Sequence, residues 1–188
     1  NSDLADLGTV MPNVYHTKEE MIDCVNAFYE GMVRRSEEMK QHPNHKTGEN
    51  YAYLGLPPCF LIFDEYVAFF EMLGTKESVG LLSQLKKIVM LGRQAGYFLI
   101  VACQRPDAKY FSDGIRDNFN FRVGLGRISE LGYGMLFGSD VKKQFFQKRI
   151  KGRGYCDVGT SVISEFYTPL VPKGHDFLQT IGSLAQAR

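Results

Sequence analysis

The stretch Cys59-Phe60-Leu61-Ile62-Phe63-Asp64-Glu65 decides the fold of this chain. Its first five residues form an apolar run without alternation, which is typical of a short strand buried on both faces of a parallel sheet. A second run of this kind, over 97–103, stops at Gln104-Arg105-Pro106. The leucine-rich segment 78–93 between them has helical spacing, and Gly96 is suited to end that helix. The sequence therefore predicts two parallel strands joined by a right-handed helical crossover.

The segments on either side of this unit also have readable patterns. Thr17 and Glu20 form a capping box, and apolar residues recur at helical spacing from Ile22 to Met39. Residues 1–16 are polar and irregular, and 41–58 reads as a surface loop. Downstream, the pattern predicts a short helix, a strand, two helices and a hairpin, over residues 112–118, 121–125, 129–137, 140–148 and 154–167. The fold class expected is α/β, with a mostly parallel sheet flanked by helices.

Composition excludes several classes of protein. The 188 residues carry 22 basic and 21 acidic side chains, so a highly basic nucleic-acid binder is excluded, although a local basic patch is not. The four cysteines are far apart, which argues against a zinc site or a disulfide framework and favours a reducing compartment. His42 and His45 lack accompanying ligands for a metal. No apolar run approaches the roughly 20 residues that span a bilayer.

Polar side chains follow both predicted strands at their carboxyl ends. In an open parallel sheet, ligands bind beyond those ends, so Asp64, Glu65 and Gln104 are expected at one edge. The first carboxylate could hold a hydrated Mg²⁺ beside nucleotide phosphates, and the second could polarise an attacking water. Gln104 could sense the γ-phosphate. The alternative is that acidic residues after a strand serve a turn or cap a helix, and Asp64-Glu65 alone would favour that alternative.

The loop that would wrap the phosphates is missing from this sequence. No G-x-x-x-x-G-K-[ST] string occurs, and Gly124-Leu125-Gly126 and Gly132-Tyr133-Gly134 are isolated Gly-x-Gly pairs. The chain also begins Asn1-Ser2-Asp3 without an initiator methionine. We therefore expect half of an ATP site, carried on a fragment of a longer protein.

Four strings carry a resemblance to a known family: FLIFDE (60–65), LGRQAGYFLIVACQRPD (91–107), GIRDNFNFRVGLGR (114–127) and KGRGYCDVG (151–159). With them the chain resembles the motor domain of FtsK/SpoIIIE-type DNA translocases. The likeness is closest to the coupling proteins of Gram-positive conjugative transposons and other integrative conjugative elements. The segment 1–8 and the helix with Arg34-Arg35 also resemble that family, so the likeness covers nearly the whole chain.

The resemblance implies a RecA-like P-loop NTPase core that lacks its N-terminal P-loop part. Residues 1–171 would be the C-terminal portion of that ATPase domain, and 172–188 a tail. The cofactors implied are ATP and Mg²⁺, and the working form implied is a ring, usually a hexamer. Implied partners are DNA, contacted through its backbone, and a relaxase or transfer-channel proteins. Membrane helices outside this chain would tether the protein to the cytoplasmic face, while this fragment alone would be soluble and inactive.

The family's functional residues fall on specific positions here. Asp64 matches the Walker B aspartate, which holds magnesium through water, and Glu65 matches the catalytic glutamate. Gln104 matches the sensor glutamine, which also contacts the nucleotide. An arginine acting on a neighbouring subunit's γ-phosphate is expected, and Arg122 ranks first because of its place in FNFRVGLG. The other candidates for that arginine are Arg116, Arg93 and Arg35.

Three functions fit this resemblance. The first is an ATP-driven DNA translocase in conjugative transfer, and the second is a protein-translocating ATPase like those of type VII secretion systems. The third is a docking module without catalysis. A basic segment with Phe145 and Phe146 interleaved could touch DNA, but a solvated helix with a buried Phe pair is the favoured alternative. Its basic residues are Lys142, Lys143, Lys148, Arg149, Lys151 and Arg153.

Overall fold

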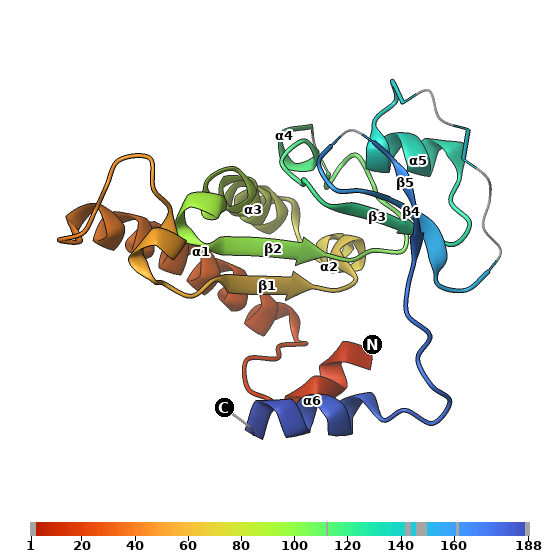
Figure 1. Cartoon of the computed structure of the whole chain (residues 1–188), viewed down its shortest axis with the longest axis horizontal. Coiled ribbons are helices and arrows are strands. Elements are labelled where there is room, and N and C mark those ends of the chain that lie inside the picture. Colours follow the sequence, from red (N-terminus) through yellow and green to blue (C-terminus); the bar gives the residue numbers. More distant parts are fainter. Residues whose placement is uncertain (1–2, 112, 142–143, 146–149, 161, 187–188) are drawn as a thin grey trace. The chain divides into compact units, whose positions relative to one another are not determined.

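A computed structural model describes residues 3–111, 113–141, 144–145, 150–160 and 162–186 of the chain (Figure 1). The chain divides into two compact units. Unit 1 comprises residues 1–104 and 176–188, and unit 2 comprises 105–175. Within the described part of the chain, no helix is long and apolar enough to cross a bilayer.

Unit 1 is built on two parallel strands, β1 (Cys59–Phe63) and β2 (Tyr97–Val101). They pair in register, from Cys59 opposite Tyr97 to Phe63 opposite Val101. The helix α3 (Thr75–Ala95) connects them, and Gly96 ends it in the left-handed conformation at φ 76°. The predicted strand–helix–strand crossover is confirmed, and so is the identity of its terminating glycine.

Helices cover the sheet of unit 1 (Figure 1). The long helix α1 (Lys18–Gln41) packs on α3, and α3 packs on β2. The predicted capping box is present, because the Glu20 amide donates to the Thr17 hydroxyl and the Thr17 amide donates to the Glu20 carboxylate. The Thr17 hydroxyl and, after it, the Thr17 amide donate to the Glu20 carboxylate and lower the pKa of that carboxyl. The core of this layer includes Val25, Met32, Leu61, Phe63, Leu81, Leu85 and Ile88.

Arg35 ties α1 to the start of both strands. Its Nη1 donates to the carbonyl oxygens of Pro57 (2.7 Å) and Ala95 (3.3 Å). Its guanidinium also lies 4.8 Å from the centroid of the Tyr97 ring. These contacts use the planar fork of an arginine to hold the loop before β1 and the end of α3 together. They give Arg35 a structural task within its own unit.

Unit 2 is a three-stranded antiparallel sheet with a helix packed on it. The strands β3 (Arg122–Leu125), β4 (Arg153–Asp157) and β5 (Ser164–Tyr167) are in that order, and α5 (Glu130–Phe137) lies against β3. A short helix, α4 (Asp113–Arg116), precedes β3. The predicted hairpin at the end of this unit is confirmed. The predicted third strand is also present, and it pairs with β4 rather than with the parallel strands.

The core of unit 2 is aromatic. Tyr133, Phe137 and Tyr155 are buried, and Phe145 stacks on Tyr133 with ring centroids 4.2 Å apart. Phe145 is thus partly buried against this core, as one member of the favoured buried pair, while Phe146 lies outside the described residues. Most of the rest of that basic segment, namely Lys142, Lys143, Phe146, Lys148 and Arg149, lies outside the described residues.

Several elements differ from what the pattern indicates. The structure adds two 3-10 helices, η1 (Asp3–Thr9) and η2 (Tyr51–Leu54), in segments read as irregular. It also adds α2 (Tyr66–Glu71) directly after Glu65 and α6 (Phe177–Gln186) within the expected tail. The helix expected over 140–148 falls mainly outside the described residues, and the described ones in that range are in no helix.

Candidate active site

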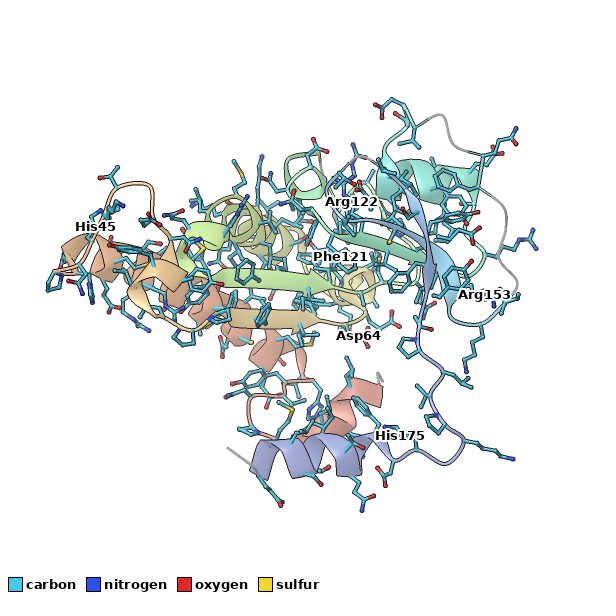
Figure 2. The ribbon with its side chains drawn as sticks, in the orientation of Figure 1. His45, Asp64, Phe121, Arg122, Arg153 and His175 are labelled. Carbon is cyan, nitrogen blue, oxygen red and sulfur yellow. The ribbon has the colours of Figure 1, made fainter. Side chains whose placement is uncertain are left out.

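The carboxyl ends of β1 and β2 are held together beyond the strands themselves. The Ala102 amide donates to the Phe63 carbonyl (2.9 Å), and the Tyr66 amide donates to the Ala102 carbonyl (3.0 Å). This extension of the ladder brings the residues after β1 beside the residues after β2. Figure 2 shows Asp64 at the tip of β1.

Glu65 and Gln104 are joined directly at this edge. The Nε2 of Gln104 donates to Oε1 of Glu65 at 3.1 Å, from a sequence separation of 39 residues. Gln104 is exposed and Glu65 is partly exposed, so a ligand can approach both side chains from solvent. The prediction that these strand ends share one edge is confirmed. The chemical roles assigned to them stay predictions.

Glu65 has an unusual backbone for its residue type. Its φ of 49° and ψ of 42° place it in the left-handed region, where a side chain with a Cβ is disfavoured. Such a conformation costs on the order of 1–3 kcal/mol and persists only where the surroundings impose it. Here the Tyr66 amide is fixed by Ala102, and the Glu65 carbonyl accepts from Phe69 (3.1 Å).

The side chain of Glu65 tests one of the alternative explanations for an acidic residue after a strand, namely helix capping. Glu65 occupies the N-cap position of α2, yet its side chain makes no capping hydrogen bond. Its carboxylate accepts from Gln104 instead. Helix capping therefore does not explain Glu65, whereas the turn part of that alternative holds for its backbone, and the carboxylate beside Gln104 is what the ATPase interpretation requires.

The site lies over apolar side chains. Tyr66 is 1% exposed and contacts the rings of Phe63 and Phe70. Burial raises the pKa of the Tyr66 hydroxyl, and the neighbouring Cys103 adds to that shift. Burial, followed by the charge of Glu65, raises the pKa of the Cys103 thiol. Both groups are thus neutral at pH 7.

Asp64 fits a magnesium ion that is bound together with a nucleotide. It is partly exposed, adjacent to Glu65, and offers the carboxylate oxygens that Mg²⁺ prefers. The described residues contain no group of three His, Cys, Asp or Glu side chains that could enclose a metal. A single protein carboxylate suits an ion that keeps several waters and is held mainly by phosphates.

The candidates for an arginine acting in trans are placed differently. In unit 2, Arg122 donates to three carbonyl oxygens, those of Phe119 (2.8 Å), Arg116 (3.0 Å) and Leu136 (3.2 Å). Arg93 is exposed on α3, and Arg116 lies 3.7 Å from the Asp117 carboxylate. The carbonyl contacts give Arg122 a structural task within its own unit, and its role in trans stays a prediction.

Arg122→Lys is expected to destabilise unit 2 by about 1–2 kcal/mol, because a lysine keeps the charge but cannot reach three carbonyls in a fixed fork. Urea unfolding monitored by tyrosine fluorescence measures this change. Arg127→Lys is the matched control, because Arg127 is exposed and just past the same strand. Equal stability of the two variants would contradict the structural task of Arg122.

Two features of the site are not among those that the sequence analysis predicts. One is α2, and the other is the left-handed conformation of Glu65, which is the turn into that helix. A signal for α2 exists, because Tyr66, Phe69 and Phe70 recur at helical spacing and all three are buried. No pattern indicates the backbone of Glu65, which follows from the hydrogen bond between Tyr66 and Ala102.

A comparison with known proteins found one close curated relative. The chain is 57% identical over 182 residues to the FtsK domain-containing protein YdcQ of Bacillus subtilis (strain 168). This match covers 96% of the chain and 38% of that relative, so the chain spans well under half of the relative's length. No protein-family model matches the chain.

Solved structures with the same fold include three ATPases or coupling proteins. The cytoplasmic domain of the Thermomonospora curvata type VII secretion ATPase EccC superposes with a TM-score of 0.63 at 18% identity, covering 92% of this chain and 21% of that one. The pCW3 conjugation coupling protein TcpA, in its monomer form with ATPγS, superposes with a TM-score of 0.59 at 16% identity. That match covers 78% of this chain and 44% of TcpA. EssC (ATPases 2 and 3) from Geobacillus thermodenitrificans superposes with a TM-score of 0.56 at 14% identity. That match covers 90% of this chain and 32% of the EssC chain.

These findings confirm the resemblance that the sequence motifs indicated. The α/β architecture, with a parallel sheet flanked by helices, is that of FtsK-like P-loop ATPase domains. The chain is a close homologue of an FtsK domain-containing protein and has the fold of solved type VII secretion ATPases and a conjugation coupling protein.

Proposed function

We propose that this chain supplies the Walker B and sensor half of the ATP site in a DNA translocase that serves conjugative transfer. The observation that carries the proposal is the hydrogen bond between Gln104 and Glu65 at the carboxyl edge of two parallel strands. An edge of this kind is where open parallel sheets bind ligands. The phosphate-binding loop comes from a segment outside these 188 residues, so the chain alone is inactive.

Each residue has a separate task in this site. Asp64 binds the metal through its carboxylate, directly or through water. When bound with ATP, Mg²⁺ offsets the negative charge of the phosphates. Glu65 orients the attacking water and accepts its proton at a carboxylate oxygen. Gln104 donates its Nε2–H group to Glu65 and, with nucleotide present, to a γ-phosphate oxygen.

The shared donor gives Gln104 a way to couple nucleotide binding to the position of Glu65. The side-chain amide has two N–H groups, so Gln104 can donate to Glu65 and to a γ-phosphate oxygen at once and thereby link the two. The left-handed backbone of Glu65 fixes the position from which its carboxylate accepts this hydrogen bond. Arg122 of a neighbouring subunit remains the first candidate for the arginine that completes the site in a ring, usually a hexamer.

The rate of Mg²⁺-dependent ATP hydrolysis, with and without double-stranded DNA, tests this function. The protein used carries the upstream segment with the phosphate loop joined to this chain. We expect a rate that rises on adding DNA and that Asp64→Asn lowers strongly. Hydrolysis that ignores DNA would contradict the translocase.

A second candidate function is a protein-translocating motor. It is favoured by the superposition on EccC, which is named a type VII secretion ATPase. Such a motor hydrolyses ATP without a response to DNA. If the folded protein with its phosphate loop does not hydrolyse ATP at all, the remaining function is that of a docking module, which recognises a relaxase or a channel protein.

The setting proposed for the translocase is the cytoplasmic face of the membrane. Helices outside this chain tether it there, and a relaxase or transfer-channel proteins receive the DNA. Co-purification of the complete protein with membranes, lost on removing such helices, is the result expected.

A further inference from the structure

Charge is divided unequally between the two units. Unit 2 contains 12 basic and 7 acidic residues, a net charge of +5, whereas unit 1 contains 10 basic and 14 acidic residues, a net charge of −4. The two values cover all 188 residues and sum to the +1 of the whole chain. The near-neutral net charge of the whole chain is therefore the sum of a negative unit and a positive one, and a positive net charge favours polyanions.

Part of this positive charge gathers at one end of the antiparallel sheet. Leu125 pairs with Gly154, and the Gly126 amide donates to the Arg153 carbonyl (2.7 Å). On the other side, Arg153 pairs with Tyr167, and the Thr168 amide donates to the Gly152 carbonyl (2.8 Å). The end of β3, the start of β4 and the end of β5 thus meet there. The exposed cations at this place, the basic end, are Arg127, Lys151 and Arg153.

The cations of the basic end are available to a ligand. Among the described residues, no ion pair joins Arg127, Lys151 or Arg153 to a carboxylate. The acidic side chain nearby, Glu165, accepts a hydrogen bond from the Tyr167 hydroxyl. Figure 2 shows Arg153 at the start of β4.

Arg153 is also held in a defined place. Its guanidinium lies 4.9 Å from the centroid of the Tyr167 ring, and that tyrosine is 53% exposed. Stacking on a ring leaves the edge of the guanidinium, with its N–H donors, facing outward. A planar fork that is fixed in advance loses less entropy when it binds a phosphate.

We infer that the basic end contacts the phosphate backbone of DNA, and that unit 2 binds DNA while unit 1 hydrolyses ATP. This inference rests on the proposed function, because the translocase supplies the reason for a polyanionic partner. Contacts of this kind depend on salt and are indifferent to base sequence. Two arginines and a lysine on one sheet end offer three phosphate contacts.

Binding of the 188-residue chain to a fluorescein-labelled 20-base-pair duplex, followed by anisotropy at several salt concentrations, tests the inference. The variant Arg127→Gln/Lys151→Gln/Arg153→Gln removes the three cations. The matched control is Lys40→Gln/Lys76→Gln/Lys86→Gln, which removes three exposed lysines from unit 1 and gives the same net charge. Melting temperatures show that both variants fold.

The basic-end variant is expected to bind roughly tenfold more weakly near 0.1 M salt, with a slope of log affinity against log salt that is flatter by about 2–3. The control variant is expected to match the unchanged chain within about a factor of two. Arg127→Lys/Arg153→Lys, which keeps the charge, is expected to retain most of the affinity.

Other outcomes would overturn the inference. Equal weakening by both triple variants would mean that net charge, rather than the basic end, sets the affinity. If the three cations are needed for binding to phosphatidylserine vesicles but not for binding to DNA, the surface is a membrane contact instead. If the chain binds DNA and the basic-end variant binds it as tightly as the unchanged chain, this inference fails while the proposed function stands. If the complete protein hydrolyses ATP and never responds to DNA, the proposed function fails as well.

Discussion

Glu65→Gln is expected to lower the rate of ATP hydrolysis by about 100-fold or more while ATP still binds. The change removes a base but keeps the shape of the side chain. In the native chain Gln104 Nε2 donates to the Glu65 carboxylate at 3.1 Å. The side-chain oxygen of the glutamine can still accept this hydrogen bond. The backbone hydrogen bond from Tyr66 to Ala102 is also unaffected. The variant therefore separates the chemistry of the carboxylate from its part in the fold.

The measurement is kcat and KM for Mg²⁺-ATP, in the protein that carries the phosphate loop, at saturating DNA. The matched control is Glu38→Gln, because Glu38 is an exposed glutamate on α1 with an ion-pair distance of 4.0 Å to Arg34. We expect a fall in kcat with little change in KM for Glu65→Gln, and unchanged kinetics for the control. A Glu65→Gln enzyme with near-normal kcat would remove Glu65 from the proposed role.

Gly92→Ala is expected to destabilise unit 1 by about 2–3 kcal/mol, although alanine is the better helix former. Gly92 is buried near the end of α3, where the helix passes the start of β2. A Cβ added there would overlap the carbonyl oxygen of Tyr97, which is backbone and cannot rotate away. The strand or the helix end would have to shift, and with it the register that places Gln104 beside Glu65.

The same substitution elsewhere in α3 provides the control. Gly80 lies in the interior of the helix, is exposed, and has no atom within 4 Å of an added Cβ. Gly80→Ala is therefore expected to stabilise the chain by about 0.5–1 kcal/mol. Urea unfolding of the two variants, with opposite signs expected, is the measurement. A stabilising Gly92→Ala would show that the close approach of α3 and Tyr97 does not constrain the fold.

Much of the edge that carries Glu65 and Gln104 could be predicted, because buried parallel strands have a recognisable apolar pattern in the sequence. Two apolar runs that end in polar residues predicted both strands, their crossover and the meeting of Glu65 with Gln104. The hydrogen bond between those side chains follows from the register. Here local composition and global topology point to the same arrangement.

The sequence could not predict features that depend on contacts between distant segments. The left-handed conformation of Glu65 is imposed by Ala102, which lies 37 residues further along the chain. Arg35 and Arg122 looked alike as candidate catalytic arginines, and only the structure shows that both donate to backbone carbonyls. The pairing of β3 with β4 was hidden for the same reason, since period and composition do not specify a partner strand.

The central claim is that the edge formed by Asp64, Glu65 and Gln104 faces the γ-phosphate of ATP. A structure of the protein with its phosphate loop, Mg²⁺ and a non-hydrolysable ATP analogue tests this claim most directly. The account predicts an Asp64 oxygen on the metal or on one of its waters, with direct bonds near 2.1 Å, and Gln104 Nε2 at about 3 Å from a γ-phosphate oxygen. A bound nucleotide whose γ-phosphate lies beyond the reach of all three side chains, even through a water, would contradict it.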